Sequence, residues 1–479
     1  MRIIHLITFF LCAYVSVYAQ QDFIKVAHNE VLGTLTFIAT ASNQPGSAPS
    51  YQKYINEAVG NDADFTQLTK RFASIDVETS IHRERYPEKR HPFTSTMDLL
   101  WVASANSTSI DDFATRTIGF LPPNDHTALI EIMHQILPYY KKHVWSTTTT
   151  QRAQLEQSIQ GYVPQIETLF NKVNVFLGSN WSKSTPFKIM LYPIPLKSGG
   201  TTAIPKGNNL ICSYLSEREK EGEDIVGIAI HEMNHILFDA QPLALQENID
   251  TWFTTSSNPY AALAYDFFDE GLATAVGNGW AYEQLNGKLD TGEWYSFEYI
   301  NGYGKKLYPL VKTYMNANNT IDKAFIEQAI ILFGEAFPKA ITDLDILMNN
   351  LNIFSQTEDE SLMDVYFAGV RERFRMRSAY FSSPINRDDS FTRLRENNRT
   401  KLIVVDKDQG SIFPILQKQL PSLPKNTDLN TSFVTSFYDK ETQSTIVLIN
   451  CLQKEDYGPL MDQLKAEKYV TYGKIISLE

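Results

Sequence analysis

Two histidines and a glutamate stand together near the middle of the chain, in the run His231-Glu232-Met233-Asn234-His235. Side chains four residues apart lie on the same face of a helix, so both imidazoles can reach one small cation. Glu232 points about 100° further round the helix, which keeps it out of the histidine pair but near a metal-bound water. The spacing therefore predicts a Zn2+ site with His231 and His235 as ligands and Glu232 as the general base.

The flanking sequence predicts the helix that this spacing requires. Acidic residues at 221–224 come where the positive end of a helix dipole favours negative charge. An apolar stripe of helical periodicity follows at Ile225, Ile228, Ala229, Ile236 and Leu237. An apolar shell limits water access and strengthens the electrostatic interactions that a zinc hydrolase uses. The alternative is a helix with two surface histidines and a solvated glutamate that have no chemical role.

A zinc site with two histidines needs a third protein ligand. The continuation His-x-x-Gly-x-x-His of the metzincins is excluded, because Phe238 occupies its glycine position and Gln241 its last histidine position. The segment 265–275 predicts a second buried helix, on which the carboxylate of Glu270 is costly unless it is paired or metal-bound. Competing carboxylates are Asp239, Asp250, Asp266 and Asp269.

The order His231-Glu232-x-x-His235 followed by Asp269-Glu270-Gly271-Leu272-Ala273 resembles the gluzincins, metallopeptidases whose third zinc ligand is a glutamate on the next helix. The resemblance implies that Glu270 is the third ligand and that Ala273 lets the two helices pack closely. It also implies an α+β fold, with a mainly helical zincin-like catalytic domain and a small upstream β-sheet. The helical region before the site is similar to poorly characterised secreted bacterial proteins of the peptidase MA-like group.

Two features depart from the gluzincin pattern. The stretch between His235 and Glu270 is longer than in the best-known thermolysin-like and aminopeptidase members, so an inserted loop is expected around 241–259. The Gly-x-Met-Glu-Asn run, with which the aminopeptidase branch reads a substrate amino terminus, is missing upstream. This favours an endopeptidase or another specificity. Candidates for the donor that stabilises the oxyanion, none preferred over the others, are Tyr260, Tyr265, Tyr282 and Tyr303.

Charge and targeting signals bound the class of protein. The chain has 479 residues and a net charge of −12, which argues against nucleic-acid binding. Residues 1–19 predict a secretory signal peptide, with an apolar run after Arg2 and small residues before Gln20. No later stretch has the roughly 18 apolar residues of a spanning helix, so a secreted or periplasmic protein without a transmembrane anchor is expected. The sequence leaves open whether Cys212 and Cys451 pair.

Four regions are expected along the chain: the signal peptide (1–19), a mainly helical region (20–180), the zincin-like catalytic domain (181–395) and a C-terminal module (396–479). Helices are predicted at 31–41, 51–59, 65–75, 125–144 and 151–177, with long helices over 303–380. Strands at 198–203 and 209–214 precede the site helix, where an extended substrate could add as another strand. The charged segment 81–92 is expected to be a solvated linker, with a cleft-lining loop as the alternative.

The C-terminal module differs in character from the rest of the chain. Its predicted strands are 401–405, 433–438, 445–450 and 474–478, and its predicted helices are 411–420 and 457–467. The resulting βαββαβ order matches a ferredoxin-like module. The module contains no histidine and no ligand cluster. A packing or partner-binding role is therefore expected for it.

The leading hypothesis is a secreted zinc metallopeptidase that acts on a peptide or protein substrate. In it, His231, His235 and Glu270 hold Zn2+, and Glu232 accepts a proton from the attacking water. One alternative is a non-catalytic surface or periplasmic binding protein on a gluzincin-like fold. Another is a zinc hydrolase of non-peptide amides or esters, because the ligands alone do not distinguish these substrates.

Overall fold

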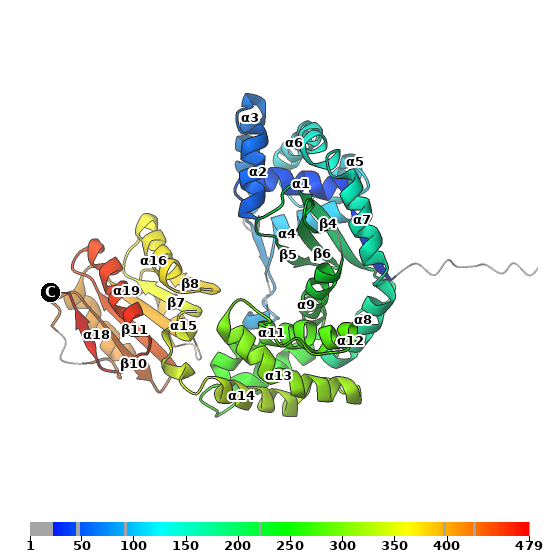
Figure 1. Ribbon diagram of the computed structural model, residues 1–479. Helices are drawn as coiled ribbons and strands as arrows, with labels where there is room; N and C mark the ends of the chain where they lie inside the picture. The colour runs from blue at the N-terminus through cyan, green and yellow to red at the C-terminus, as the bar shows by residue number, and fades with distance from the viewer. Residues whose placement is uncertain are drawn as a thin grey trace, which may run out of the picture. The chain divides into compact units, whose positions relative to one another are not determined.

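The computed structural model describes residues 23–44, 48–90, 93–219, 222–395, 399–424 and 428–478 (Figure 1). The predicted signal peptide, 1–19, lies outside the described residues. The chain forms two compact units. Of the described residues, those within 23–75, 101–167 and 182–222 form unit 1, and those within 76–100, 168–181 and 223–478 form unit 2.

Unit 1 is a four-stranded sheet with helices. Its strands are, in sheet order, β1 (Ile24–His28), β4 (Phe187–Ile194), β6 (Asn209–Leu215) and β5 (Ala203–Lys206). The first three run parallel, and β5 is antiparallel to β6. Its helices are α1 (Glu30–Ala41), α2 (Pro49–Val59), α3 (Ala63–Ala73), α5 (Ile110–Arg116), α6 (Pro123–Tyr140), η2 (Lys141–Trp145) and α7 (Thr149–Gln160). Two more helices have residues in both units, α4 (Thr96–Ala105) and α8 (Val163–Leu177).

The predicted helices of unit 1 are confirmed, with one division. The helix expected over 151–177 is wrong as a single element, because α7 ends before Gly161 and α8 begins at Val163. β6 confirms the strand predicted at 209–214, whereas β5 begins only where the other predicted strand ends. β4 was not predicted, since a parallel strand buried on both faces has no polar alternation to reveal it.

The helical part of unit 2 carries the histidine run on α9 (Glu223–Asp239). The helices that follow are α10 (Leu243–Thr254), α11 (Ala261–Thr274), the π-helix η3 (Ala275–Ala281), α12 (Tyr282–Asn286), α13 (Glu298–Ala317), α14 (Lys323–Ala336), η4 (Ala340–Thr342) and α15 (Leu344–Leu347). The loop expected around 241–259 is wrong, because α10 occupies most of it. Ile249 and Phe253 of α10 are buried one turn apart, which gives this insertion an apolar face of its own.

A short hairpin in unit 2 holds the charged segment 81–92. Its strands are β2 (Ser80–His82) and β3 (Phe93–Ser95), with the 3-10 turn η1 (Glu88–Arg90) between them. Residues 81–86 are exposed, as a solvated linker would be. Arg90 is only 3 % exposed, and its guanidinium stacks 3.4 Å from the centre of the Phe238 ring and donates to the Phe238 carbonyl oxygen. Arg90 is therefore part of the packing around α9.

The C-terminal part of unit 2 is a six-stranded sheet with helices on both faces (Figure 1). The strands are, in sheet order, β12 (Ile475–Ser477), β10 (Phe433–Asp439), β11 (Ser444–Asn450), β9 (Thr400–Val405), β7 (Asn350–Ser355) and β8 (Ser378–Ser382). One face packs against α16 (Glu360–Arg373) and α19 (Tyr457–Ala466), which follows the short turn η5 (Lys454–Asp456). The other face packs against α17 (Asp388–Leu394) and α18 (Gln409–Gln419).

The predicted order of strands and helices within 396–479 is confirmed, but the ferredoxin-like arrangement is wrong. In the sheet, β12 pairs with β10, and the place beside β9 is taken by β7. β7 and β8 come from the segment 303–380 that was predicted to be helical up to its end. They extend the sheet by two parallel strands, and its second face is buried too. At the coarse level the chain is mixed α and β, as expected.

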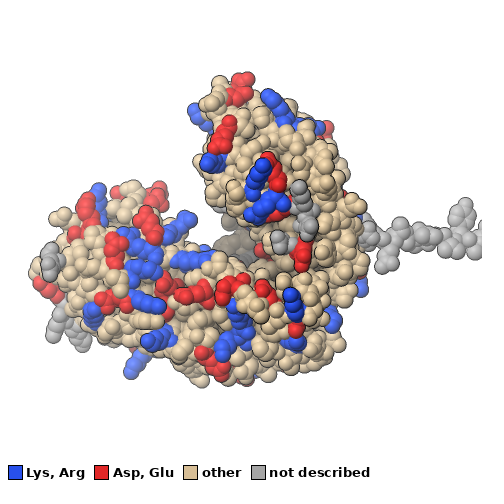
Figure 2. Space-filling view, viewed as in Figure 1, with Lys and Arg blue, Asp and Glu red and all other residues tan. Residues whose placement is uncertain are grey.

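Three further observations concern charge, membranes and cysteines. In the face drawn in Figure 2, Lys and Arg side chains are intermixed with Asp and Glu. No described helix is long and apolar enough to cross a membrane. Cys212 and Cys451, whose pairing the sequence left open, are both buried and form no disulfide with each other.

Candidate metal centre

Three packed elements of unit 2 position the centre: α9, α11 and the π-helix η3 that continues from α11 without a break. The buried side chains Ile230, Met233 and Leu237 hold α9 in the core. Gly277 of η3 packs directly against α9, since a Cβ atom built there would lie 2.8 Å from the His231 Cα atom. This contact is too close for any side chain, so a glycine is what lets the two helices approach.

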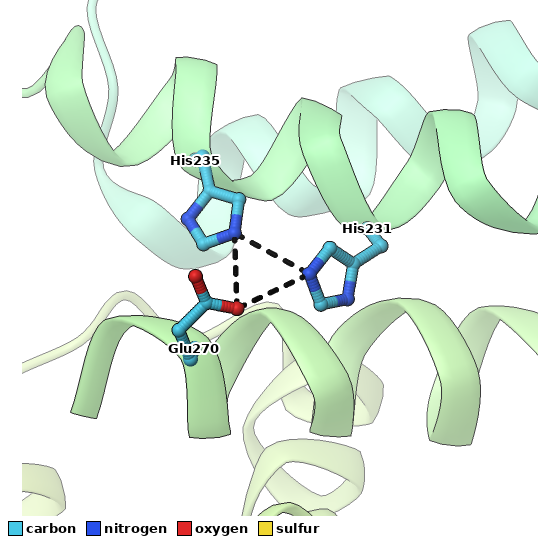
Figure 3. A group of neighbouring side chains, drawn as sticks. All are labelled: His231, His235 and Glu270. Carbon is cyan, nitrogen blue, oxygen red and sulfur yellow. Dashed lines mark hydrogen bonds and ion pairs between the residues drawn. The ribbon is translucent and has the colours of Figure 1, made fainter. Parts of the chain in front are cut away.

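His231, His235 and Glu270 converge at one point (Figure 3). The two Nε2 atoms are 3.4 Å apart, and the Glu270 Oε2 atom is 3.5 Å from His231 Nε2 and 3.7 Å from His235 Nε2. His231 is 8 % exposed, and the side chains of His235 and Glu270 are 12 % and 19 % exposed. Within the described part of the chain, this is the one group of three His, Cys, Asp or Glu side chains spaced so that it could hold a metal ion.

The outer nitrogen of each histidine has its own acceptor. His235 Nδ1–H donates to Asp269 Oδ1 over 2.9 Å, and His231 Nδ1–H donates to Asn278 Oδ1 over 3.1 Å. An acceptor at Nδ1 keeps the proton on that nitrogen and turns the lone pair of Nε2 toward the cluster. Both imidazoles are thereby oriented so that they could bind a metal ion.

The centre concentrates negative charge in a poorly solvated place. Burial by itself would lower the pKa of His235, but the carboxylates of Asp269 and Glu270 raise it to about 10. Burial would raise the pKa of Glu270, yet the His231 hydrogen bond and the charges of His235 and Arg377 lower it to about 2. In the absence of a metal the carboxylates therefore keep a proton on His235, which a bound cation would replace.

Glu232 lies on α9 between His231 and His235 and is half-buried. Burial raises the pKa of its carboxyl group, while the neighbouring His235 and His231 limit the rise. A carboxylate with a raised pKa is a stronger base than an exposed one. This is the protonation behaviour that a general base needs.

Tyr295, which the sequence did not single out, contacts the cluster on one side. Its ring stacks on His231, with centroids 6.0 Å apart and an interplanar angle of 27°. Burial together with the charge of the nearby Glu270 raises the pKa of Tyr295 to about 12. The hydroxyl therefore stays protonated at neutral pH and remains a hydrogen-bond donor.

The tyrosines proposed from the sequence as oxyanion donors are engaged elsewhere or lie outside the cluster. Tyr260 donates to the Pro338 carbonyl, Tyr265 to Asp250 and Tyr303 to the Ala329 carbonyl. Tyr282 begins α12, after the π-helix. The hydroxyls of Tyr260, Tyr265 and Tyr303 therefore donate to partners outside the cluster.

The competing carboxylates also have other roles. Asp250 accepts a hydrogen bond of 3.1 Å from the Tyr265 hydroxyl, and Asp266 pairs with Lys89 of the hairpin segment. Asp239 is exposed at the last residue of α9. The fourth carboxylate, Asp269, bonds the outer nitrogen of His235 and supports that ligand from behind.

Sequence reasoning missed three residues of the centre: Asn278, Tyr295 and Arg377. Asn278 is on a π-helix, whose register does not follow the spacing of an α-helix. Tyr295 lies in an irregular segment before α13, and Arg377 lies in the loop before β8, more than a hundred residues beyond Glu270. Side chains brought in from irregular or distant segments leave no periodic signal in the sequence.

No protein-family model, no curated protein and no solved structure matches this chain. The gluzincin resemblance therefore still rests on the motif residues in the sequence.

Proposed function

We propose that this chain is a secreted zinc-dependent hydrolase that cleaves peptide bonds at a zincin-like site formed by α9 and α11. The observation that supports it most is the convergence of His231 Nε2, His235 Nε2 and Glu270 Oε2. The half-buried carboxylate of Glu232 lies on α9 between the two histidines. Two imidazoles and one carboxylate are a donor set of catalytic zinc sites, which leave a fourth position open. The preference for peptides rests on the gluzincin resemblance.

The spacing of the donor atoms suits zinc. A tetrahedral ion with bonds of about 2.0–2.1 Å holds its ligand atoms about 3.3–3.4 Å apart. The three distances in the cluster, from 3.4 to 3.7 Å, need only small side-chain movements to reach this value. Calcium and magnesium prefer oxygen ligands, so two imidazoles favour zinc or a related transition metal.

Glu232 would move the proton of the reaction. When bound, zinc supplies Lewis acidity that lets a water molecule ionise near neutral pH. A carboxylate oxygen of Glu232 takes the proton as the water oxygen attacks the peptide carbonyl carbon. The same oxygen then gives the proton to the leaving amine nitrogen, which breaks the C–N bond and restores Glu232.

Tyr295 is the residue best placed to stabilise the carbonyl oxygen. Its ring is held against His231, and its protonated hydroxyl can donate a hydrogen bond to negative charge that develops on that oxygen.

Metal content and hydrolysis test the proposal together. The purified full chain should hold one equivalent of zinc by elemental analysis and hydrolyse members of a broad peptide library. Glu232→Gln should keep the zinc and lose hydrolysis about 10²–10⁴-fold. Glu223→Gln, at the exposed first residue of the same helix, is the matched control and should keep full activity.

Each other outcome has a distinct meaning. A chain without zinc, or a Glu232→Gln variant with full activity, would refute the proposal. Zinc binding without hydrolysis of any peptide or ester would instead indicate a binding protein, and hydrolysis of esters or non-peptide amides alone would change the substrate class.

The secretion part of the proposal rests on residues 1–19 alone. Expression of the full chain with its own N-terminus in a bacterial host should yield a protein that begins at Gln20 in the periplasm or medium, as read by mass spectrometry. A chain that keeps residues 1–19 and stays in the cytoplasm would refute it.

A further inference from the structure

Arg377 reaches the metal centre from the C-terminal part of unit 2. It lies just before β8, and its Nη2 atom is 3.4 Å from Asp269 Oδ2 and 3.7 Å from Glu270 Oε1. Its Nη1 atom also donates to the Asp266 carbonyl oxygen over 3.4 Å. One guanidinium thus contacts polar atoms of three residues within about one turn of α11.

The four oxygens of the two neighbouring carboxylates are divided between two sides. Asp269 directs Oδ1 to His235 Nδ1 and Oδ2 to Arg377. Glu270 directs Oε2 to the two imidazoles and Oε1 to Arg377. In both residues one carboxylate oxygen contacts the Arg377 guanidinium and the other contacts a histidine of the cluster.

The loop that carries Arg377 is anchored to the sheet. The Arg377 amide donates to the Asn349 carbonyl over 2.8 Å, and the Asn349 side chain donates to the Arg375 carbonyl over 2.7 Å. Asn349 directly precedes β7, so both bonds tie the loop to the start of a central strand. The guanidinium is therefore held from behind by main-chain hydrogen bonds.

We infer that Arg377 is a positioning residue of the metal centre, which presents a single oxygen of Glu270 to the metal and keeps Asp269 bonded to His235. This inference rests on the proposed metal-binding function. A guanidinium suits the task because its planar fork can contact two carboxylates, whereas an ammonium group is a single point charge. It also offsets the repulsion between two adjacent carboxylates in a poorly solvated place.

The inference assigns a role to the C-terminal sheet beyond packing or partner binding. The helices α9 and α11 contain the ligands, but the group that orders two of their carboxylates comes from the segment between α16 and β8. Metal affinity should then depend on this distant segment.

Zinc affinity of full-length variants tests the inference. Arg377→Gln should weaken zinc binding about 10- to 100-fold, as removal of an outer-shell partner typically does, measured by competition with a chromophoric chelator. Arg377→Lys keeps the charge without the fork and should bind with intermediate affinity. Arg371→Gln is the matched control, because Arg371 is exposed on α16 and its guanidinium lies over the ring of Phe367 on the same helix. Its zinc affinity should equal that of the unmodified chain.

Spectroscopy separates positioning from a purely structural role. In Co2+-loaded Arg377→Gln, Glu270 is free to offer both oxygens, so the visible absorption should weaken as the coordination number rises. Thermal unfolding of the metal-free variants shows whether they are folded, and the lysine variant provides the comparison if the glutamine variant is not.

Unchanged zinc affinity and an unchanged Co2+ spectrum in both Arg377 variants would overturn the inference while leaving the hydrolase proposal intact. If the unmodified chain binds zinc but hydrolyses nothing, the hydrolase proposal fails and the affinity comparison still decides the role of Arg377. An unmodified chain that binds no zinc overturns both.

Discussion

Tyr295 and Tyr260 allow a direct comparison of two single hydroxyl groups. Tyr295→Phe keeps the ring against His231 and removes the hydroxyl, so zinc content should stay the same while kcat for peptide hydrolysis falls about 10²–10³-fold. Steady-state kinetics of the zinc-loaded protein measures this. Tyr260→Phe removes a hydroxyl that is bonded to the Pro338 carbonyl and should leave kcat unchanged. Equal kcat values for the two variants would exclude Tyr295 as the oxyanion donor.

His28 predicts how the stability of unit 1 depends on pH. The imidazole is 3 % exposed and bonds Glu156 over 3.0 Å and the Tyr214 hydroxyl over 2.9 Å. Burial lowers the pKa of His28 below 6.5, and the His28 hydrogen bond lowers the pKa of Glu156 below 4.5. The unfolded chain then binds more protons than the folded chain. Both groups therefore stabilise the folded state at pH values above their unfolded pKa values of 6.5 and 4.5, and this contribution is lost as the pH falls.

The free energy of unfolding should therefore decrease first below pH 6.5 and further below pH 4.5, as denaturant titrations at several pH values would show. His28→Gln should flatten the upper part of this dependence. If His28→Gln and the unmodified chain have the same slope between those two pH values, His28 does not contribute as the geometry implies.

The residues that the sequence could identify are the local ones. His231, Glu232 and His235 lie within one and a half turns of a helix, so their spacing alone indicates a common site. Glu270 needed the family resemblance, because the intervening α10 separates it from the histidines along the chain. Asn278, Tyr295 and Arg377 reach the cluster only through tertiary packing, which no spacing rule describes.

At the scale of secondary structure elements, the contact between η3 and α9 can be tested with two glycines. A Cβ atom at Gly277 would lie 2.8 Å from His231 backbone atoms, so Gly277→Ala must push the two elements apart. It should lower the free energy of unfolding by about 1–3 kcal/mol, the range for overpacked cores, and weaken zinc binding. Denaturant titration and chelator competition measure the two effects.

Gly227→Ala is the control, since Gly227 is on α9 and no atom lies within 4 Å of a Cβ built there. An alanine in a helix interior is favoured over glycine by about 0.5–1 kcal/mol, so this variant should be stabilised. The opposite signs of the two alanine substitutions are the decisive result. A Gly277→Ala variant as stable as the unmodified chain would mean that η3 and α9 are not in tight contact.

The predicted elements were correct where an apolar stripe meets water. α2 and α3 each bury one apolar face and expose the other, and their predicted bounds, 51–59 and 65–75, lie within two residues of the observed ones. β7 is buried on both faces and carries no alternation, so the sequence did not separate it from a helical segment. β4, which is also buried along its length, was not predicted as any element. The strand order of the C-terminal sheet could not be predicted for a related reason, since β7 and β8 fall in a segment that was predicted to be helical.

At the scale of the whole molecule, the metal should stabilise the fold without being required for it. Two extensive apolar clusters fill the C-terminal part of unit 2, and the ligand side chains are already oriented by Asp269 and Asn278. This differs from small zinc domains, whose folding free energy comes from the metal. The metal-free chain should therefore remain folded and lose only the free energy of stabilisation that zinc binding adds.

The stabilisation by zinc can be measured. Zinc at a hundred times its dissociation constant stabilises the folded state by about 2.7 kcal/mol. A unit of this size should then unfold about 5 °C higher, since each kcal/mol raises Tm by roughly 2–4 °C in domains of 150–250 residues and less in larger ones. Calorimetry of chelator-treated protein with and without zinc should show this shift for the transition of unit 2. Magnesium should produce none, and neither should zinc with a His231→Asn, His235→Asn double variant, because both controls lack the pairing of imidazole donors with a metal that prefers them. Equal Tm values for the treated protein with and without zinc would show that the converging side chains do not bind it.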